Sequence, residues 1–215
     1  EDQNIFTDFA DWIENYNSWV STSNQEAVDV KRKQQNDKVV EYITKEIEIK
    51  PDYSLGYRNR ALLYIRVKDY EKAEADYTKA IELDPENDEN YYDRGNFYRN
   101  YLEDNDKAIA DFTKAIELDP VDAYNYFERG DAYAYNEQYN EALASYLKAE
   151  ELDKEKSLAK SEGLYNNMAV IFVNLEQNEK AVEYYTKQIE ISPDYFLGYS
   201  NRAFRYAEDL KDYEK

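Results

Sequence analysis

The spacing of the prolines constrains the fold of this 215-residue chain more than any other sequence feature. There are four of them, Pro51, Pro85, Pro120 and Pro193. The intervals are 34, 35 and 73 residues, and the longest divides into 34 and 39 with Lys154 in the missing proline's place. Proline lacks an amide hydrogen and clashes with the preceding turn, so each one marks the end of a helix. A period near 34 residues predicts an array of helix–turn–helix units.

The residues between the prolines repeat as well. In the unit 54–87, one helical face is formed by residues at i, i+3, i+4 and i+7, which are Tyr57, Arg60, Ala61 and Tyr64. A polar turn follows, and a second helix is marked by Ala73, Tyr77 and Ala80. The position of Ala61 is taken in later units by Gly95, Gly130, Ala169 and Ala203. Small residues that alternate with aromatic ones predict paired helices in close contact.

This pattern resembles the tetratricopeptide repeat (TPR) family, whose W-x2-L-G-x2-Y…A-x3-F…P motif appears here as Tyr91-x2-Arg94-Gly95-x2-Tyr98…Ala108-x3-Phe112…Pro120. The resemblance covers roughly residues 20–215 and implies an all-α, right-handed superhelical solenoid of helix–turn–helix pairs. The chain departs from the family where arginine replaces the usual leucine, at Arg60, Arg94, Arg129 and Arg202. We expect these arginines to pack their stems and to turn their guanidinium groups to solvent or to a carboxylate, with Asp76 and Asp111 as candidate partners.

The repeat divides the chain into seven segments. We expect an amphipathic capping helix in 1–19, a degenerate repeat in 20–53, repeats in 54–87, 88–122 and 123–156, a repeat with a short insertion in 157–195, and the first helix of a truncated repeat in 196–215. Two alternatives stay open: the first segment could instead dock on a partner, and Asn24 to Ile49 could form one continuous helix. Residues 35–64 also match residues 177–206 at an offset of 142, which suggests duplication of a block of four repeats.

The composition excludes several classes of site. The chain has no cysteine and no histidine, so disulfides, Cys/His zinc sites and mechanisms that need a Cys nucleophile or a His base are excluded. Its net charge of −20 disfavours nucleic acid, which requires clustered cations. No apolar run approaches the roughly 20 residues that cross a bilayer, so we expect a soluble chain without membrane insertion. The chain begins at Glu1, no signal sequence is visible, and the compartment stays unknown.

Stacked helix pairs form a long concave surface. In the TPR family the first helix of each repeat lines that surface, and the resemblance implies that it holds a peptide or a partner helix. Projection of the first helices places these candidate contacts there: Arg58, Asn59, Leu62, Tyr92, Asp93, Asn96, Arg99, Phe127, Glu128, Asp131, Tyr135, Asn166, Asn167, Val170 and Asn174. Asparagines can bond a ligand's backbone, aromatic rings offer rigid contact area, and Asp93, Glu128 and Asp131 would favour Lys or Arg on the ligand.

The sequence therefore predicts a non-catalytic scaffold that binds a protein or peptide, and its charge allows a partner with basic residues without requiring one. No phosphate-binding loop and no nucleophile motif is present, and we expect no cofactor and no metal. The alternative is an architectural module of a larger protein or complex. Such a module would self-associate through the N-terminal helix or through the unpaired C-terminal helix.

Overall fold

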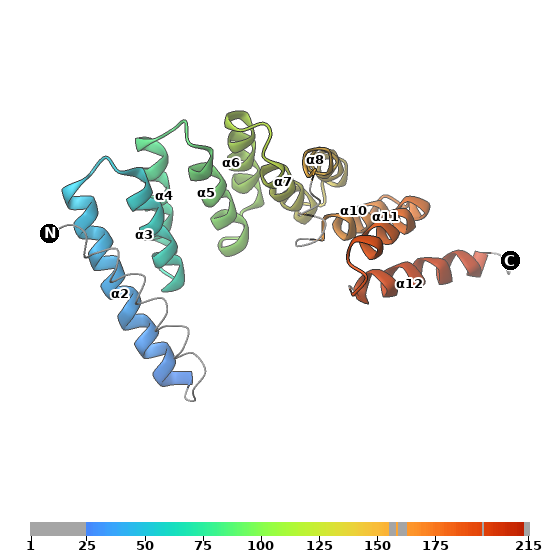
Figure 1. Ribbon diagram of the computed structural model, residues 1–215, viewed down its shortest axis with the longest axis horizontal. Helices are drawn as coiled ribbons and strands as arrows, with labels where there is room; N and C mark the ends of the chain where they lie inside the picture. The colour runs from blue at the N-terminus through green and yellow to red at the C-terminus, as the bar shows by residue number, and fades with distance from the viewer. Residues whose placement is uncertain (1–24, 155–157, 159–162, 195, 213–215) are drawn as a thin grey trace.

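A computed structural model of the chain describes residues 25–154, 158, 163–194 and 196–212, and all regular structure in these residues is helical. Figure 1 shows the helices in a curved row from α2 to α12. Their bounds are α2 Gln25–Ile49, α3 Ser54–Arg66, α4 Tyr70–Leu83, α5 Asp88–Tyr101, α6 Asn105–Leu118, α7 Ala123–Tyr135, α8 Tyr139–Leu152, α10 Leu164–Asn174, α11 Asn178–Ile191 and α12 Phe196–Asp212. The predicted capping helix in 1–19 lies outside the described residues, as does most of the insertion near residue 157.

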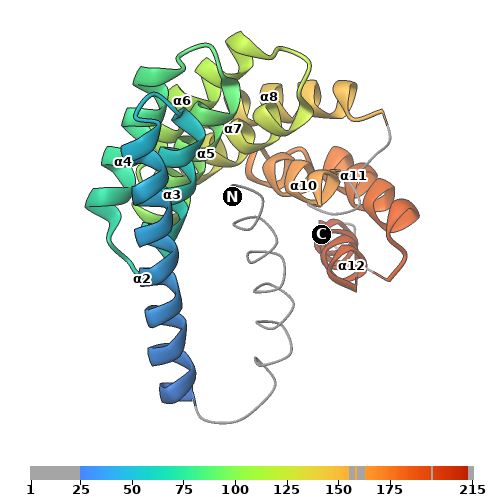
Figure 2. The ribbon, with the colours of Figure 1, turned by 60° about the vertical axis from the view of Figure 1, so that its left-hand side comes forward.

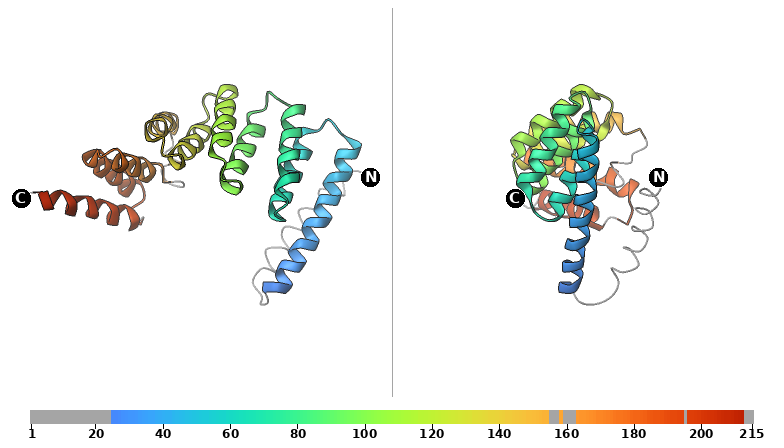
Figure 3. Two further views of the ribbon diagram at one scale, coloured as in Figure 1. Left: turned by 180° about the vertical axis from the view of Figure 1, so that it is seen from behind. Right: turned by 90° about the vertical axis from the view of Figure 1, so that its left-hand side faces the viewer.

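The helices form the predicted right-handed superhelical solenoid of antiparallel pairs. α3 packs on α4, α5 on α6, α7 on α8 and α10 on α11, and each pair then packs on the next. Figure 2 shows the row as an arch, with α4, α6 and α8 along its outer side and α3, α5, α7 and α10 along its inner side. The two outermost described helices, α2 and α12, lie at opposite ends of the row (Figure 3). No helix in the described part of the chain is long and apolar enough to cross a membrane.

The start of the row corrects one prediction. Residues 25–49 of the predicted degenerate repeat form the single helix α2, which is the alternative considered above, and not two helices. Gln25–Ile49 contains neither glycine nor proline, so its sequence does not force a break, and the continuous helix keeps the backbone hydrogen bonds that a turn would give up.

Small residues bring the two helices of each pair together, as predicted. Ala61, Ala73 and Ala80 have no exposed surface, and Tyr77 is 1% exposed. In the third pair a Cβ atom built on Gly130 would lie 2.6 Å from Cδ1 and Cε1 of Tyr146, which is closer than real Cβ contacts allow. The small residue on the first helix therefore provides the space that the aromatic ring of the second helix occupies.

The arginine row connects neighbouring pairs, and the predicted carboxylate partners are confirmed. Arg60 donates to both oxygens of Asp76, from Nε at 2.7 Å and from Nη2 at 2.8 Å, and its Nη1 donates to Thr44 Oγ1 of the preceding helix at 3.1 Å. Its Cζ atom lies 5.5 Å and 5.8 Å from the ring centres of Tyr57 and Tyr64. Arg94 repeats this arrangement with Asp111 and Thr78. Arg60 and Arg94 therefore stabilise the stack and are not available to a ligand, whereas Arg129 has Ser145 in place of the aspartate and donates to Ser145 and Thr113.

Each complete pair turns through a left-handed residue between its two helices. The four residues are Lys68, Glu103, Glu137 and Glu176, with φ of 62°, 54°, 58° and 58°. None of them is glycine, although a side chain in this conformation costs about 1–2 kcal/mol. The turns therefore hold some strain that the packing of the flanking helices sustains.

Replacing Glu137 with glycine is expected to raise the free energy of unfolding by about 1 kcal/mol, because the strain at φ 58° exceeds the extra freedom that glycine has in the unfolded chain. Urea denaturation followed by circular dichroism measures the change. Glu183→Gly is the matched control, since Glu183 is exposed within α11, and there glycine should lower stability by roughly 0.5–1 kcal/mol. Equal losses in both variants would contradict the strained turn.

Candidate partner-binding face

The inner side of the arch is crossed by ion pairs between successive first helices. Arg58 on α3 reaches α5, where its Nη2 lies 2.7 Å from Glu89 Oε2 and its Nε lies 3.2 Å from Asp93 Oδ2. The side chains of Arg58 and Asp93 are 15% and 28% exposed. Burial raises the pKa of the Asp93 carboxyl above its usual value, and the nearby guanidinium of Arg58 acts in the opposite direction.

A larger ionic cluster joins the next three pairs, and we call Arg99, Glu128 and Asp131 the central cluster. Arg99 on α5 forms ion pairs with Glu128 and with Asp131 on α7, the latter at 2.9 Å. Asp131 Oδ1 also accepts hydrogen bonds from the Tyr146 hydroxyl of α8 at 2.5 Å and from Asn167 Nδ2 of α10 at 3.2 Å. The side chains of the central cluster are 11%, 13% and 19% exposed, so the charges are largely withdrawn from solvent.

These contacts correct the expectation of an acidic groove. Asp93, Glu128 and Asp131 each lie against an arginine of the chain itself, so their charge is neutralised before any ligand arrives. Burial raises the pKa of the Asp131 carboxyl, and its bonds from Tyr146, Arg99 and Asn167 oppose that rise. A partner's Lys or Arg would have to replace an existing pair, which offers little net gain in free energy.

Phe127 requires a second correction. It was placed on the concave surface, but it is 3% exposed and packs against Tyr146 with ring centres 5.9 Å apart. Tyr92, at the same position of the preceding repeat, is half-buried against Phe112 at 6.0 Å. Burial raises the pKa of Tyr92 to about 12. This repeat position points between the helices, so its aromatic side chains belong to the core and not to the partner surface.

Other predicted residues remain accessible. Asn59, Leu62, Tyr135 and Asn174 are exposed, with Leu62 at 45% and Tyr135 at 72%. Three predicted asparagines are half-buried and hydrogen-bonded: Asn96 accepts from Arg99, Asn166 accepts from Asn201, and Asn167 donates to Asp131. The accessible predicted residues therefore lie on α3, on the last turn of α7 and on α10.

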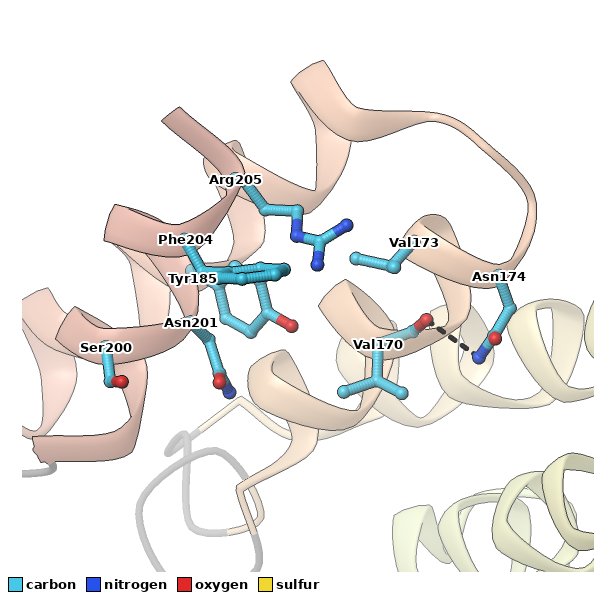
Figure 4. A pocket seen from close by; sticks show the side chains of 8 residues that line it. All are labelled: Val170, Val173, Asn174, Tyr185, Ser200, Asn201, Phe204 and Arg205. Atoms are coloured by element: carbon cyan, nitrogen blue, oxygen red, sulfur yellow. Dashed lines mark hydrogen bonds between the residues drawn. The ribbon is translucent and has the colours of Figure 1, made fainter. Parts of the chain in front are cut away.

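A pocket of about 370 Å³ lies between α10, α11 and α12. Figure 4 shows Phe204 and Asn201 on one wall, Val170 and Asn174 on the opposite wall, and the Arg205 guanidinium directed toward Val173. The Cζ atom of Arg205 lies 4.7 Å from the ring centre of Phe204. The complete lining is Val170, Val173, Asn174, Tyr185, Ser200, Asn201, Phe204 and Arg205.

The sequence projection found Val170 and Asn174 but missed the α12 wall of this pocket. One signal was available: a single position of the repeat carries Asn96 and Asp131 in the middle units and Val170 and Phe204 in the last two. Between α10 and α12 the crossing contact is a 3.4 Å hydrogen bond from Asn201 Nδ2 to Asn166 Oδ1. Apolar side chains thus stand where the two middle units place polar ones, and the walls offer a partner both apolar surface and amide groups.

Comparison with known proteins identifies the family. Sequence models described as tetratricopeptide repeat match residues 54–87, 76–110, 112–144 and 163–195, and together they cover more than half of the chain. The chain belongs to the tetratricopeptide repeat family. Among its described residues, no group of three or more acidic side chains could hold a metal ion.

Solved TPR structures share this fold. They include YrrB, titled a TPR protein with an unusual peptide-binding site (23% identity, TM-score 0.66, 81% of this chain and 87% of that chain), and PilW, titled a widely conserved type IV pilus biogenesis factor (20%, 0.67, 88% and 87%). MamA from Desulfovibrio magneticus RS-1 is a third (17%, 0.65, 79% and 94%). Identities this low establish the fold alone.

One curated relative shares a short stretch of sequence. It is a UDP-N-acetylglucosamine–peptide N-acetylglucosaminyltransferase of Giardia intestinalis, 38% identical over 58 residues. The match spans 27% of this chain and only 4% of that enzyme. So small a share of the enzyme's length transfers no activity to the TPR chain.

Proposed function

We propose that this TPR chain is a non-catalytic scaffold that holds an extended segment of a partner protein along its concave surface, with the α10–α12 pocket as the principal contact. The observation that supports this most directly is the pocket itself. It has a volume of about 370 Å³, and valine, phenylalanine, two asparagines and a serine are among the residues that line it. Apolar walls with a few placed polar groups are typical of ligand sites. A TPR fold that binds peptides has a precedent in YrrB, by its title.

The properties of the surface define the ligand expected there. Val170 and Phe204 are 40% and 57% exposed, so an aliphatic or aromatic side chain that covers them is stabilised by burial of apolar area. Asn174 and Asn201 can donate to and accept from the ligand's main chain. Because Asp93, Glu128 and Asp131 are already paired, a run of basic residues is not required.

The proposal is tested with a phage-displayed library of random 12-residue peptides selected on the 215-residue chain. The peptides that enrich are then titrated against variants by fluorescence anisotropy. Val170→Asp and Phe204→Ala should each weaken binding at least tenfold, since one places a charge in the wall and the other removes much of it. Leu147→Asp is the matched control, because Leu147 is 44% exposed on α8 and outside the pocket. Failure of any peptide to enrich, or equal binding by all variants, would refute the concave site.

A further inference from the structure

Charged contacts link the inner helices to the outer helices in successive pairs. On α5 the Arg94 guanidinium donates to both oxygens of Asp111 from Nε and Nη2, each at 2.8 Å. On the same helix the ring centre of Tyr98 lies 4.8 Å from Lys107 Nζ. Lys107 and Asp111 both belong to α6, four positions apart. The pair α3–α4 has both contacts as well, formed by Arg60 with Asp76 and by Tyr64 with Lys72.

The pair α7–α8 keeps the arginine but not its carboxylate. Ser145 of α8 stands at the position of Asp111, and its hydroxyl accepts from Arg129 Nε at 3.3 Å. Arg129 Nη1 donates to Thr113 Oγ1 of α6 at 3.4 Å. Within the described residues Arg129 forms no ion pair, and its Nη2 has no hydrogen-bond partner. Arg129 therefore keeps a donor that the other two arginines use for a carboxylate.

The tyrosine next to this arginine also lacks its usual neighbours. Glu141 of α8 stands at the position of Lys107, so an anion replaces the cation that lies over the ring in the other pairs. Ile109 of α6 stands at the position of Glu74, which accepts from the tyrosine of the α5–α6 pair at 2.9 Å. In the part of the chain that the structure describes, the hydroxyl of the half-buried Tyr133 makes no hydrogen bond and the exposed Glu141 forms no ion pair. Both side chains are therefore available to a partner's cation.

These departures are not a general weakening of the charged contacts toward the end of the stack. In the next pair, α10–α11, Met168 replaces the arginine and has no exposed surface, and Lys180 Nζ lies 5.3 Å from the ring centre of Phe172. That pair exchanges the ionic contact for apolar packing and keeps the cation over the ring. α6 and α10 pack on the α7–α8 pair from either side, so Arg129 and Tyr133 lie within the stack.

We propose that Arg129, Tyr133, Glu141 and Ile109, here called the α7 outer site, bind a segment of a partner protein that carries an acidic and a basic side chain about one helical turn apart. The acidic side chain, an Asp or Glu, pairs with the Arg129 guanidinium. The basic side chain, a Lys or Arg, lies over the ring of Tyr133 and pairs with Glu141. The partner thus supplies the two charges that α6 supplies to α5 from within the chain.

The charge of the chain favours a different protein over a second copy as the occupant. A net charge of −20 opposes the association of two copies. Exposed lysines that have an acidic residue one turn away, such as Lys79 and Lys114, already pair with it in the chain itself. The α7 outer site is also distinct from the concave pocket, since none of its residues lines that pocket.

The test compares the parent with a closed chain, Glu141→Lys/Ser145→Asp, which gives α8 the two charged residues that α6 carries. Its lysine should lie over Tyr133 and its aspartate should pair with Arg129, so both positions are filled from within. Circular dichroism verifies that the two chains have the same helical content. A phage-displayed library of random 16-residue peptides is then selected on the parent after depletion on the closed chain. We expect enrichment of peptides with an acidic and a basic residue three or four positions apart.

Synthetic copies of the enriched peptides are titrated by fluorescence anisotropy. The closed chain should bind them at least tenfold more weakly than the parent, whereas Val170→Asp in the concave pocket should leave binding unchanged. A peptide whose basic residue is replaced by Glu should bind the parent at least tenfold more weakly, and the Glu141→Lys chain should recover most of that loss.

Several results would overturn the α7 outer site. One is the absence of any peptide that distinguishes the parent from the closed chain. Another is binding that is indifferent to the charges of the peptide, or binding that Val170→Asp abolishes. A dimer of the parent, measured by light scattering, that the closed chain does not form would also overturn the proposal, because a second copy would then be the occupant.

Discussion

Gly130→Leu is expected to lower the free energy of unfolding by about 3 kcal/mol or more, because the site has no room for a side chain. A single Cβ atom at Gly130 would already lie 2.6 Å from two ring atoms of Tyr146. The ring cannot move aside easily: Tyr146 is 1% exposed, contacts Phe127, and donates its hydroxyl to Asp131 at 2.5 Å. Displacement of the ring would therefore disturb both the core and the central cluster.

Urea denaturation of the parent and the variant, monitored at 222 nm, measures this loss. Ala144→Leu is the matched control, since Ala144 is exposed on α8 and the same increase in size there should change stability by less than about 0.5 kcal/mol. Gly130→Ala should fall between the two, because alanine's higher helix propensity offsets part of the clash. A Gly130→Leu chain that unfolds at the same urea concentration as the parent would show that the small residue has no role in packing.

The same local chemistry explains why the fold could be predicted from the sequence. Pro85 and Pro120 end helices for reasons confined to their own backbone, and the alternation of Tyr57 and Ala61 with Ala73 and Tyr77 is a property of helical period. Both sequence signals act within one helix or helix pair, so they do not depend on where that helix lies in the fold. The continuity of α2 was harder to predict. A degenerate repeat and a continuous helix differ only by one turn, and neither glycine nor proline marks such a turn in this sequence.

The partner surface was less predictable because it depends on distances between repeats. A helical projection places Asp93 and Asp131 on one face, but it cannot show that Arg58 and Arg99 reach across to the next helix and neutralise them. The projection also places Phe127 at the edge of the exposed helix face. Because consecutive helix residues are rotated by about 100°, a residue at that edge can be either buried or exposed. The pocket requires two helices to be positioned together, so Phe204 could be assigned to it only from the structure.

The second large effect concerns the central cluster. Arg99→Met is expected to lower the free energy of unfolding at pH 7 by about 3 kcal/mol, because it leaves Glu128 and Asp131 largely buried without their cation. Arg58→Met is the control with a similar change in shape. Its partners Glu89 and Asp93 are 64% and 28% exposed, more than the partners of Arg99, so solvent screens the remaining charges better and the loss should be about 1–2 kcal/mol. Equal losses in the two variants would contradict the importance of burial.

The pH dependence of the Arg99→Met chain separates lost charge pairing from lost packing. Burial already raises the pKa of Asp131 in the parent, and the guanidinium of Arg99 limits that rise, so its removal raises the pKa further. A carboxyl group with a higher pKa in the folded state gives stability that is complete below its unfolded pKa, near 4, and that is lost as the pH rises through the folded pKa. The free energy of unfolding should therefore fall more for the variant than for the parent between pH 5 and pH 7. The difference in stability between the two chains should be smaller at pH 5 than at pH 7. Adding Asp131→Asn and Glu128→Gln to the variant should recover part of the lost stability at pH 7, because no unpaired carboxylate then remains in the cluster. If the Arg99→Met chain is instead less stable than the parent by the same amount at every pH, the effect of Arg99 comes from the packing of its aliphatic stem alone.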